Sequence, residues 1–165
     1  MTDSINRSSR TSRRIDAAPA VIYRAFTDPS LLAHWQAPGD MTATVHAFDL
    51  RVGGGYEMSL TYPWSGQDAR GKTTAREDRY TARFVELIPS SRIVEVITFA
   101  TSDPAFMGEM TMEVTLDAHA NQTDVTIAFT NIPPGIRPED NDEGTRLSLE
   151  KLAALVEKPE LAGTT

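Results

Sequence analysis

The first part of the chain has the pattern of an edge strand followed by two short helices. A strand is expected from about Ser8 to Ile15, and apolar residues at positions 21, 22, 25 and 26 then recur with the spacing of one helical face. Pro19 suits the first turn of that helix, because the N–H that proline lacks would have no partner there. Asp28 followed by Pro29 repeats the start signal and predicts a second helix with Asp28 as its cap.

Patterns of antiparallel strands follow between positions 42 and 130. Apolar and polar residues alternate with a period of two, which predicts a sheet with one apolar and one polar face. The glycines at 53–55 predict a hairpin turn, and a polar loop is expected from Pro63 to Thr74. The side chains expected on the apolar face are His46, Phe48, Leu50, Tyr56, Met58, Leu60, Tyr62, Tyr80, Ala82, Phe84, Met110, Met112, Val114, Leu116, Val125, Ile127 and Phe129.

The strand from Ile93 to Ala100 can be placed in two ways. Alternation with Ile97 puts Glu95 on the apolar face, where a carboxylate costs several kcal/mol unless it is paired or protonated. The opposite orientation turns Val94 and Val96 inward and leaves Glu95 in water. The pattern of apolar residues here favours neither orientation.

The C-terminal segment, about Pro138 to Glu157, provides a cover for the apolar face. Leu149, Leu152 and Val156 belong to one helical stripe, and the acidic residues of the first turns suit the positive end of the helix dipole. The sequence therefore predicts an α+β helix-grip fold. In it a curved antiparallel sheet of about six or seven strands wraps around a long C-terminal helix, with two short helices after the first strand.

Composition narrows the possible functions. We expect one domain at 8–158, a disordered N-terminal tail at 1–7 and a C-terminal tail at 159–165. The net charge of −7 argues against nucleic-acid binding, and the absence of cysteine excludes disulfides and thiolate chemistry. No apolar run approaches the roughly 20 residues that cross a bilayer, so we expect a cytoplasmic protein without membrane insertion.

The order of the expected elements, with several short motifs, resembles the START-like superfamily, also called helix-grip or SRPBCC. The matching motifs are Arg14-Ile15-Asp16-Ala17 with Pro19; Thr27-Asp28-Pro29 with Leu32 and Trp35; Asp49-Leu50-Arg51-Val52-Gly53-Gly54; Phe84 and Glu86 with Pro89; and Arg92-Ile93-Val94. Within the superfamily they are most similar to the branch of homologues of the activator of the 90-kDa heat-shock protein ATPase. The superfamily includes lipid carriers, hormone receptors, aromatic cyclases and co-chaperones, so the resemblance implies a fold more narrowly than an activity.

The start of the last helix departs from that family. Its members commonly have Gly-Trp at this point, whereas here Gly144 is followed by Thr145. If the tryptophan of the family fills the gap between sheet and helix, the smaller threonine should leave a larger cavity.

The sequence shows no convincing set of catalytic residues. Of the three histidines only His46 is expected on the apolar face, where a hydrogen-bonded core histidine is the commoner role. No pair of histidines has the spacing of a metal site, and we expect no cofactor and no metal. An acid–base pair of His46 and Glu95, as in an aromatase or cyclase type of enzyme, stays an alternative.

The remaining hypothesis is a pocket between sheet and C-terminal helix that binds an apolar or aromatic small molecule. The residues expected to contact the ligand are His46, Phe48, Tyr56, Met58, Tyr62, Tyr80, Glu95, Met110, Met112, Thr145 and Leu149. The alternative to a pocket is that the same aromatic and methionine side chains fill a core. A co-chaperone-like role with a chaperone or other protein partner is implied by the resemblance. A homodimer through an exposed sheet edge is a further possibility.

Overall fold

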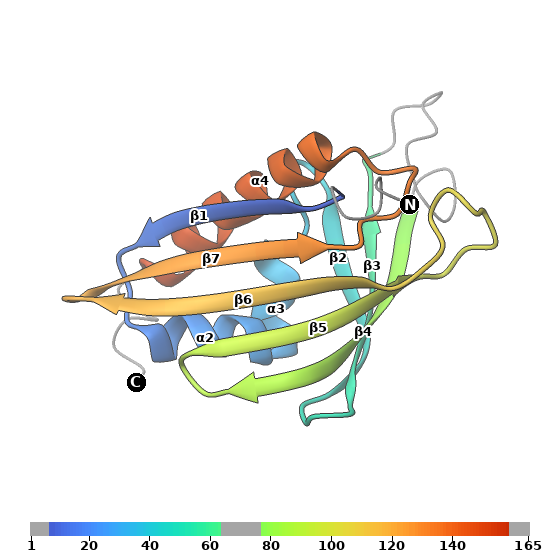
Figure 1. Ribbon diagram of the computed structural model, residues 1–165. Helices are drawn as coiled ribbons and strands as arrows, with labels where there is room; N and C mark the ends of the chain where they lie inside the picture. Colours follow the sequence, from blue (N-terminus) through green and yellow to red (C-terminus); the bar gives the residue numbers. More distant parts are fainter. Residues whose placement is uncertain (1–6, 64–76, 159–165) are drawn as a thin grey trace.

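The computed structural model describes residues 7–63 and 77–158, in which a seven-stranded sheet curves around a long helix (Figure 1). The elements are β1 (Ser9–Ile15), α2 (Pro19–Thr27), α3 (Pro29–Trp35), β2 (Thr42–Asp49), β3 (Gly55–Thr61), β4 (Glu77–Ile88), β5 (Arg92–Phe99), β6 (Met110–His119), β7 (Gln122–Thr130) and α4 (Pro138–Val156). This is the predicted α+β helix-grip arrangement, which is confirmed.

The order of strands in the sheet is β1-β7-β6-β5-β4-β3-β2, and every neighbouring pair is antiparallel. Helix α4 contacts the edge strand β1, α3 contacts the other edge strand β2, and the helices contact one another. The interior therefore lies between the sheet and the helices. All three helices lie on one face of the sheet in Figure 1.

The two short helices form for the reasons that the sequence indicates. The Asp28 side chain accepts a hydrogen bond from the Ser30 N–H at 3.0 Å, which confirms it as the cap of α3. The Trp35 indole N–H donates to the Ala25 carbonyl at 2.9 Å, and its ring meets the Phe26 ring edge-on at 4.6 Å. These contacts fix α2 and α3 as one unit beneath the sheet.

The predicted hairpin between β2 and β3 needs its glycines. Gly53 has φ +89°, and its N–H donates to the Phe84 carbonyl at 2.9 Å. A Cβ at Gly55 would lie 1.9 Å from the Ala82 carbonyl oxygen, so no larger residue fits there. The turn is thereby packed against β4.

Strand β2 departs from the predicted alternation in two places. A bulge between Val45 and Ala47 shifts its register against β3, so His46 and Phe48 do not share a face and His46 is exposed. Leu50 follows the last residue of the strand and is 48% exposed. The expectation that His46 and Leu50 point inward with Phe48 is therefore wrong. The extra residue of the bulge interrupts the alternation of faces at His46, and Leu50 lies beyond the end of the strand.

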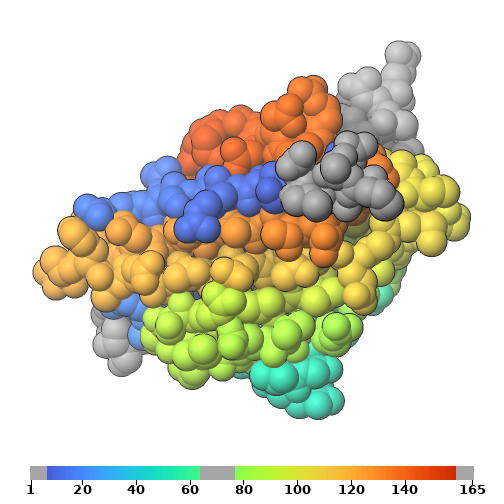
Figure 2. Space-filling view, viewed as in Figure 1, coloured from blue at the N-terminus to red at the C-terminus, as the bar shows by residue number. Residues whose placement is uncertain are grey.

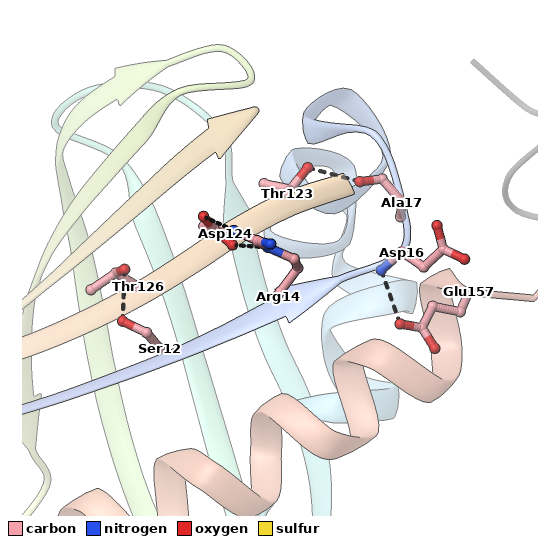
Figure 3. Close-up of polar contacts among 8 residues, drawn as sticks. All are labelled: Ser12, Arg14, Asp16, Ala17, Thr123, Asp124, Thr126 and Glu157. Atoms are coloured by element: carbon pink, nitrogen blue, oxygen red, sulfur yellow. Dashed lines mark hydrogen bonds and ion pairs between the residues drawn. The ribbon is translucent and has the colours of Figure 1, made fainter. Parts of the chain in front are cut away.

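One end of the interior is closed by contacts between β1, β7 and the end of α4 (Figure 3). The Thr123 hydroxyl donates to the Ala17 carbonyl at 2.7 Å in a buried site, and the Asp16 N–H donates to a Glu157 carboxylate oxygen at 3.0 Å. On the outer surface Arg14 pairs with Asp124 at 2.7 Å. Together these contacts connect the first strand to the last strand and the last helix.

Helix α4 buries the predicted stripe of Leu149, Leu152, Ala153 and Val156, none of which is more than 2% exposed. No helix among residues 7–63 and 77–158 has the length and apolar character to span a membrane. The predicted tails at 1–7 and 159–165 and the loop from Pro63 to Thr74 fall almost wholly outside the described residues, so the domain boundaries stay a prediction.

Candidate functional site

A pocket of about 410 Å³ lies between the inner face of the sheet and the first half of α4. Figure 2 shows the opposite, outer face of strands β5 to β7, where the side chains form a continuous surface. Strands β3 to β7, the segments that follow α3 and β7, and α4 all supply wall residues. The pocket is thus built from residues that are distant in sequence.

Most of the wall is apolar and rich in aromatic and methionine side chains. Phe99 and Tyr80 meet edge-on across β5 and β4, with ring centroids 6.1 Å apart. The apolar and aromatic side chains on the wall are Trp35, Met41, Leu60, Tyr62, Tyr80, Ile97, Phe99, Phe106, Met110, Met112, Ile127, Phe129 and Ile136. Such a surface adapts to flat and apolar molecules.

The first half of α4 presents small residues to the pocket, which is why the space is not filled. Gly144, Thr145 and Ser148 line it. The Thr145 hydroxyl donates back to the Asn141 carbonyl at 2.8 Å, and the Ser148 hydroxyl donates to the Gln36 carbonyl at 2.9 Å. Both hydroxyls are therefore satisfied within the protein, and neither fills the pocket.

The segment before α4 is held in place by Arg7. Its guanidinium donates to the carbonyl oxygens of Ile132 and Pro133, each at 2.7 Å, and also to that of Ile136. Ile136 belongs to the pocket wall. Arg7 thus positions one rim of the pocket by satisfying backbone carbonyls that do not belong to a strand or helix.

Asp78 is an acidic residue of the wall that the sequence analysis did not identify. It is 3% exposed, and one of its carboxylate oxygens accepts a hydrogen bond from the Tyr62 hydroxyl at 3.2 Å. Its spacing of two from Tyr80 was a usable signal, because alternation places both on one face. The expected polar loop reached almost to β4, and so the start of that strand was missed.

Glu95 points into the apolar interior and is 1% exposed, which settles the orientation of β5. One of its carboxylate oxygens accepts a hydrogen bond from the Tyr56 hydroxyl at 2.7 Å. Burial raises the pKa of Glu95 to about 7, although the Tyr56 hydrogen bond acts in the opposite direction. Burial, with the nearby Glu95 carboxyl, also raises the pKa of Tyr56 and Tyr80 above the usual range.

The predicted ligand-contacting residues separate into three groups. Five of them line the pocket: Tyr62, Tyr80, Met110, Met112 and Thr145. Phe48, Tyr56, Met58, Glu95 and Leu149 pack in the interior beside it and are not on its wall. Whether any of these residues binds a ligand stays a prediction.

His46 lies apart from both groups. Its ring is on the polar face of the sheet, where Nε2 is 2.8 Å from the Ser59 hydroxyl oxygen. The bulge in β2 turns it away from Glu95, so the acid–base pair considered from the sequence does not assemble. Within residues 7–63 and 77–158 no three acidic or histidine side chains gather as a metal-binding group.

The wall residues outside the predicted set come from connecting segments as well as from strands and helices. Gln36 and Phe106 belong to connecting segments, whose side-chain directions depend on tertiary packing and not on a period. Asn141 and Ser148 belong to α4. Gln36 and Phe106 carry no periodic signal, whereas Ser148 lies four residues before Leu152 and so belongs to the buried stripe of α4.

Comparisons with known proteins agree with this architecture. A family model described as "Activator of Hsp90 ATPase homolog 1-like protein" matches residues 16–157. The crystal structure of CV1439 from Chromobacterium violaceum is 35% identical to the chain, with a TM-score of 0.81, and the alignment covers 92% of this chain and 98% of that one. No curated protein matches the chain.

More distant structures share the fold. A solution structure of a protein from Arthrobacter aurescens has a TM-score of 0.74 at 21% identity, covering 96% of this chain and 90% of that one. An AHSA1-like protein from Aeromonas hydrophila has a TM-score of 0.68 at 18% identity, covering 94% and 97% of the two chains. At these identities the likeness concerns the fold alone.

Proposed function

The chain belongs to the family of Activator of Hsp90 ATPase homolog 1-like proteins, and we propose that this member binds a neutral apolar or aromatic small molecule in the pocket beneath α4. The observation that supports the proposal most is the unfilled space itself, about 410 Å³ between the sheet and the first half of α4. Pockets that hold small molecules have volumes of roughly 300 to 1,000 Å³.

The chemistry of the wall supports an apolar ligand with few polar groups. Apolar and aromatic side chains form most of the wall, and the hydroxyls of Thr145 and Ser148 already donate hydrogen bonds within the protein. The polar groups of a strongly polar ligand would face this apolar wall without hydrogen-bond partners, which costs about 1–3 kcal/mol for each group.

The charges near the pocket support a ligand without a carboxylate. Asp78 is a buried acid on the wall, and Glu95 is a second buried acid behind Tyr80. Arg137, also on the wall, is exposed and pairs with Glu139 at 3.6 Å. An anionic ligand would approach these acids, so neutral sterols, flavonoids and aromatic polyketides fit better than fatty acids.

The test is a thermal-shift screen of the wild-type chain and of Thr145→Trp against these compound classes. A ligand at 100 times its Kd adds about 2.7 kcal/mol, which raises Tm by roughly 5–10 °C for a domain of this size. We expect such a shift for neutral aromatic compounds in the wild type. In Thr145→Trp the indole occupies the pocket, and the shift should fall by more than half.

Two results would contradict the proposal. One is a screen in which no compound raises the Tm of the wild type. That result would favour the protein-partner function that the family's name implies. The other is an equal shift in the wild type and in Thr145→Trp, because that would place the ligand outside the pocket.

A further inference from the structure

On the sheet side of the pocket, Asp78 and Tyr62 form a polar patch in a wall that is otherwise mainly apolar. Both residues line the pocket, and the Tyr62 hydroxyl donates to Oδ2 of Asp78 at 3.2 Å. Asp78 is 3% exposed, so its carboxyl is almost wholly withdrawn from water on a wall that a ligand would contact. Small numbers of polar groups placed in this way are what orients a ligand in an apolar pocket.

The strand register turns Asp78 inward. It lies two residues before Tyr80, so both point to the inner face, and its partner across β3 is the wall residue Leu60. The next residue, Arg79, faces the other way and pairs with Glu57 at 3.0 Å. The cation next along the strand therefore lies on the outer face of the sheet, away from the pocket.

The hydrogen bond from Tyr62 uses one part of what the Asp78 carboxyl can accept. Its length of 3.2 Å exceeds the range of about 2.5–3.0 Å that is usual for a bond between a hydroxyl and an oxygen. The two oxygens of a carboxylate offer about four lone-pair positions and accept several donors at once. A ligand hydroxyl can therefore donate to Asp78 while Tyr62 keeps its own bond.

We propose that the Asp78 carboxyl accepts a hydrogen bond from the ligand, so that the pocket selects neutral aromatic molecules that carry a hydroxyl group. This inference rests on the proposed function and names the polar group of its ligand. A hydroxyl that is buried without a partner weakens binding, whereas a hydrogen bond to a charged acceptor is stronger than one between neutral groups. The pocket thus discriminates by the hydroxyl group and not by the size of the ligand.

A neutral hydroxyl fits this place better than an ammonium group. An ammonium group is a strongly hydrated charge with three donors, and the wall beside Asp78 includes Leu60, which offers it no acceptor. A hydroxyl has a single donor, which the Asp78 carboxyl satisfies. The cost of removing the hydroxyl from water is also smaller than that of removing a charge.

The experiment compares 2-naphthol with 2-methylnaphthalene, whose methyl group is similar in size to the hydroxyl but cannot donate a hydrogen bond. Affinities are measured by fluorescence titration at pH 7 for the wild type, Asp78→Asn and Asp78→Ala. Glu95→Gln is the matched control, because it neutralises a buried acid that is not on the pocket wall. Circular dichroism checks that each variant folds.

The wild type should bind 2-naphthol more tightly than 2-methylnaphthalene. In Asp78→Ala the ratio of the two affinities should fall about tenfold or more, the value of a hydrogen bond to a charged group. In Asp78→Asn, which keeps an acceptor oxygen without the charge, the fall should be about three- to fivefold. Glu95→Gln should leave the ratio within about twofold of the wild type. Because a disturbed pocket weakens the binding of both compounds, the ratio reports on the hydrogen bond.

The outcomes separate this inference from the function beneath it. If the wild type binds neither compound, both are overturned. If it binds 2-methylnaphthalene as tightly as 2-naphthol, only the inference is overturned, and this comparison needs no substitution. The inference is also wrong if Asp78→Ala keeps the ratio of the wild type, or if Glu95→Gln lowers it equally. Tighter binding of 2-(aminomethyl)naphthalene, a cation at pH 7, would show that Asp78 selects an ammonium group and would overturn the choice of a hydroxyl.

Discussion

The two halves of α4 cover the same sheet with opposite results. Its second half, residues 149–156, presents Leu149, Leu152 and Val156, and the space beneath them is filled. Its first half presents Gly144, Thr145 and Ser148, and a pocket of about 410 Å³ remains. Helix and sheet are continuous through both halves, so the size of the side chains decides which region becomes core and which stays open.

The end contacts reinforce this difference. Thr123 and Glu157 hold β7 and the end of α4 to the segment after β1, at the filled half. The start of α4 is held by side chains around the pocket, with Asn141 donating to Ser9 at 2.8 Å. We expect the filled half to contribute more to the stability of the fold than the open half, because its side chains are large and fully buried.

The largest expected effect is a loss of stability in the filled half. Leu152→Ala removes a side chain that is 0% exposed and should lower the free energy of unfolding by about 2–5 kcal/mol. The matched change in the open half, Thr145→Ala, should cost less than about 1 kcal/mol, because it only enlarges an existing space. Urea denaturation of both variants measures the difference, and equal losses would contradict the division of α4 into two regions.

A second effect concerns Glu95 at the boundary between the two regions. Because its pKa in the folded protein is about 7, above the value of about 4.5 in the unfolded chain, folding favours its protonated form. The contribution of Glu95 to the free energy of unfolding is greatest below pH 4.5 and is lost as the pH rises through 7. The total loss is roughly 3 kcal/mol.

The wild type and Glu95→Gln should therefore differ in the pH dependence of unfolding. Between pH 4.5 and pH 8 the stability of the wild type should fall by roughly 3 kcal/mol relative to the variant, whose amide does not titrate. Urea denaturation at a series of pH values gives this difference directly. Parallel curves for the two proteins would mean that Glu95 does not titrate with a raised pKa.

The same large side chain should have different effects in the two halves. Ala153→Trp forces an indole into a site that is 2% exposed and packed, and overpacking of this kind costs about 1–3 kcal/mol or more. Thr145→Trp places the indole in the pocket and should change stability by less than about 1 kcal/mol. Thermal unfolding distinguishes them. A larger loss for Thr145→Trp would show that the pocket is not available space.

The smallest effect is a gain. A Cβ at Gly144 would have its nearest neighbour, a Pro38 carbon, at 3.9 Å, which is ordinary contact. Gly144→Ala in the helix should therefore raise the free energy of unfolding by about 0.5–1 kcal/mol. Denaturation of this variant beside the wild type checks the value, and a loss of stability would mean that the start of α4 is strained.

Much of the fold was predictable because alternation and helical spacing respond directly to burial. The inward residues of β3, β4, β6 and β7 and the stripe of α4 follow from those periods. The bulge near Val45 and the facing of Glu95 did not, since a local shift of register and a buried carboxyl both break the simple pattern. The pocket was predictable only in part: the walls from strands were expected, while Phe106 and Gln36 come from segments whose placement depends on the whole fold.

The most direct test of the central claim is an NMR titration of the chain with ¹³C-labelled methionine methyl groups, using 2-naphthol as the ligand. Met41, Met110 and Met112 line the pocket, whereas Met107 is 51% exposed and does not. We expect saturable shifts of the three pocket methyl signals, larger than that of Met107, and the loss of these shifts in Thr145→Trp. Shifts confined to Met107, or none at any methionine, would contradict this prediction.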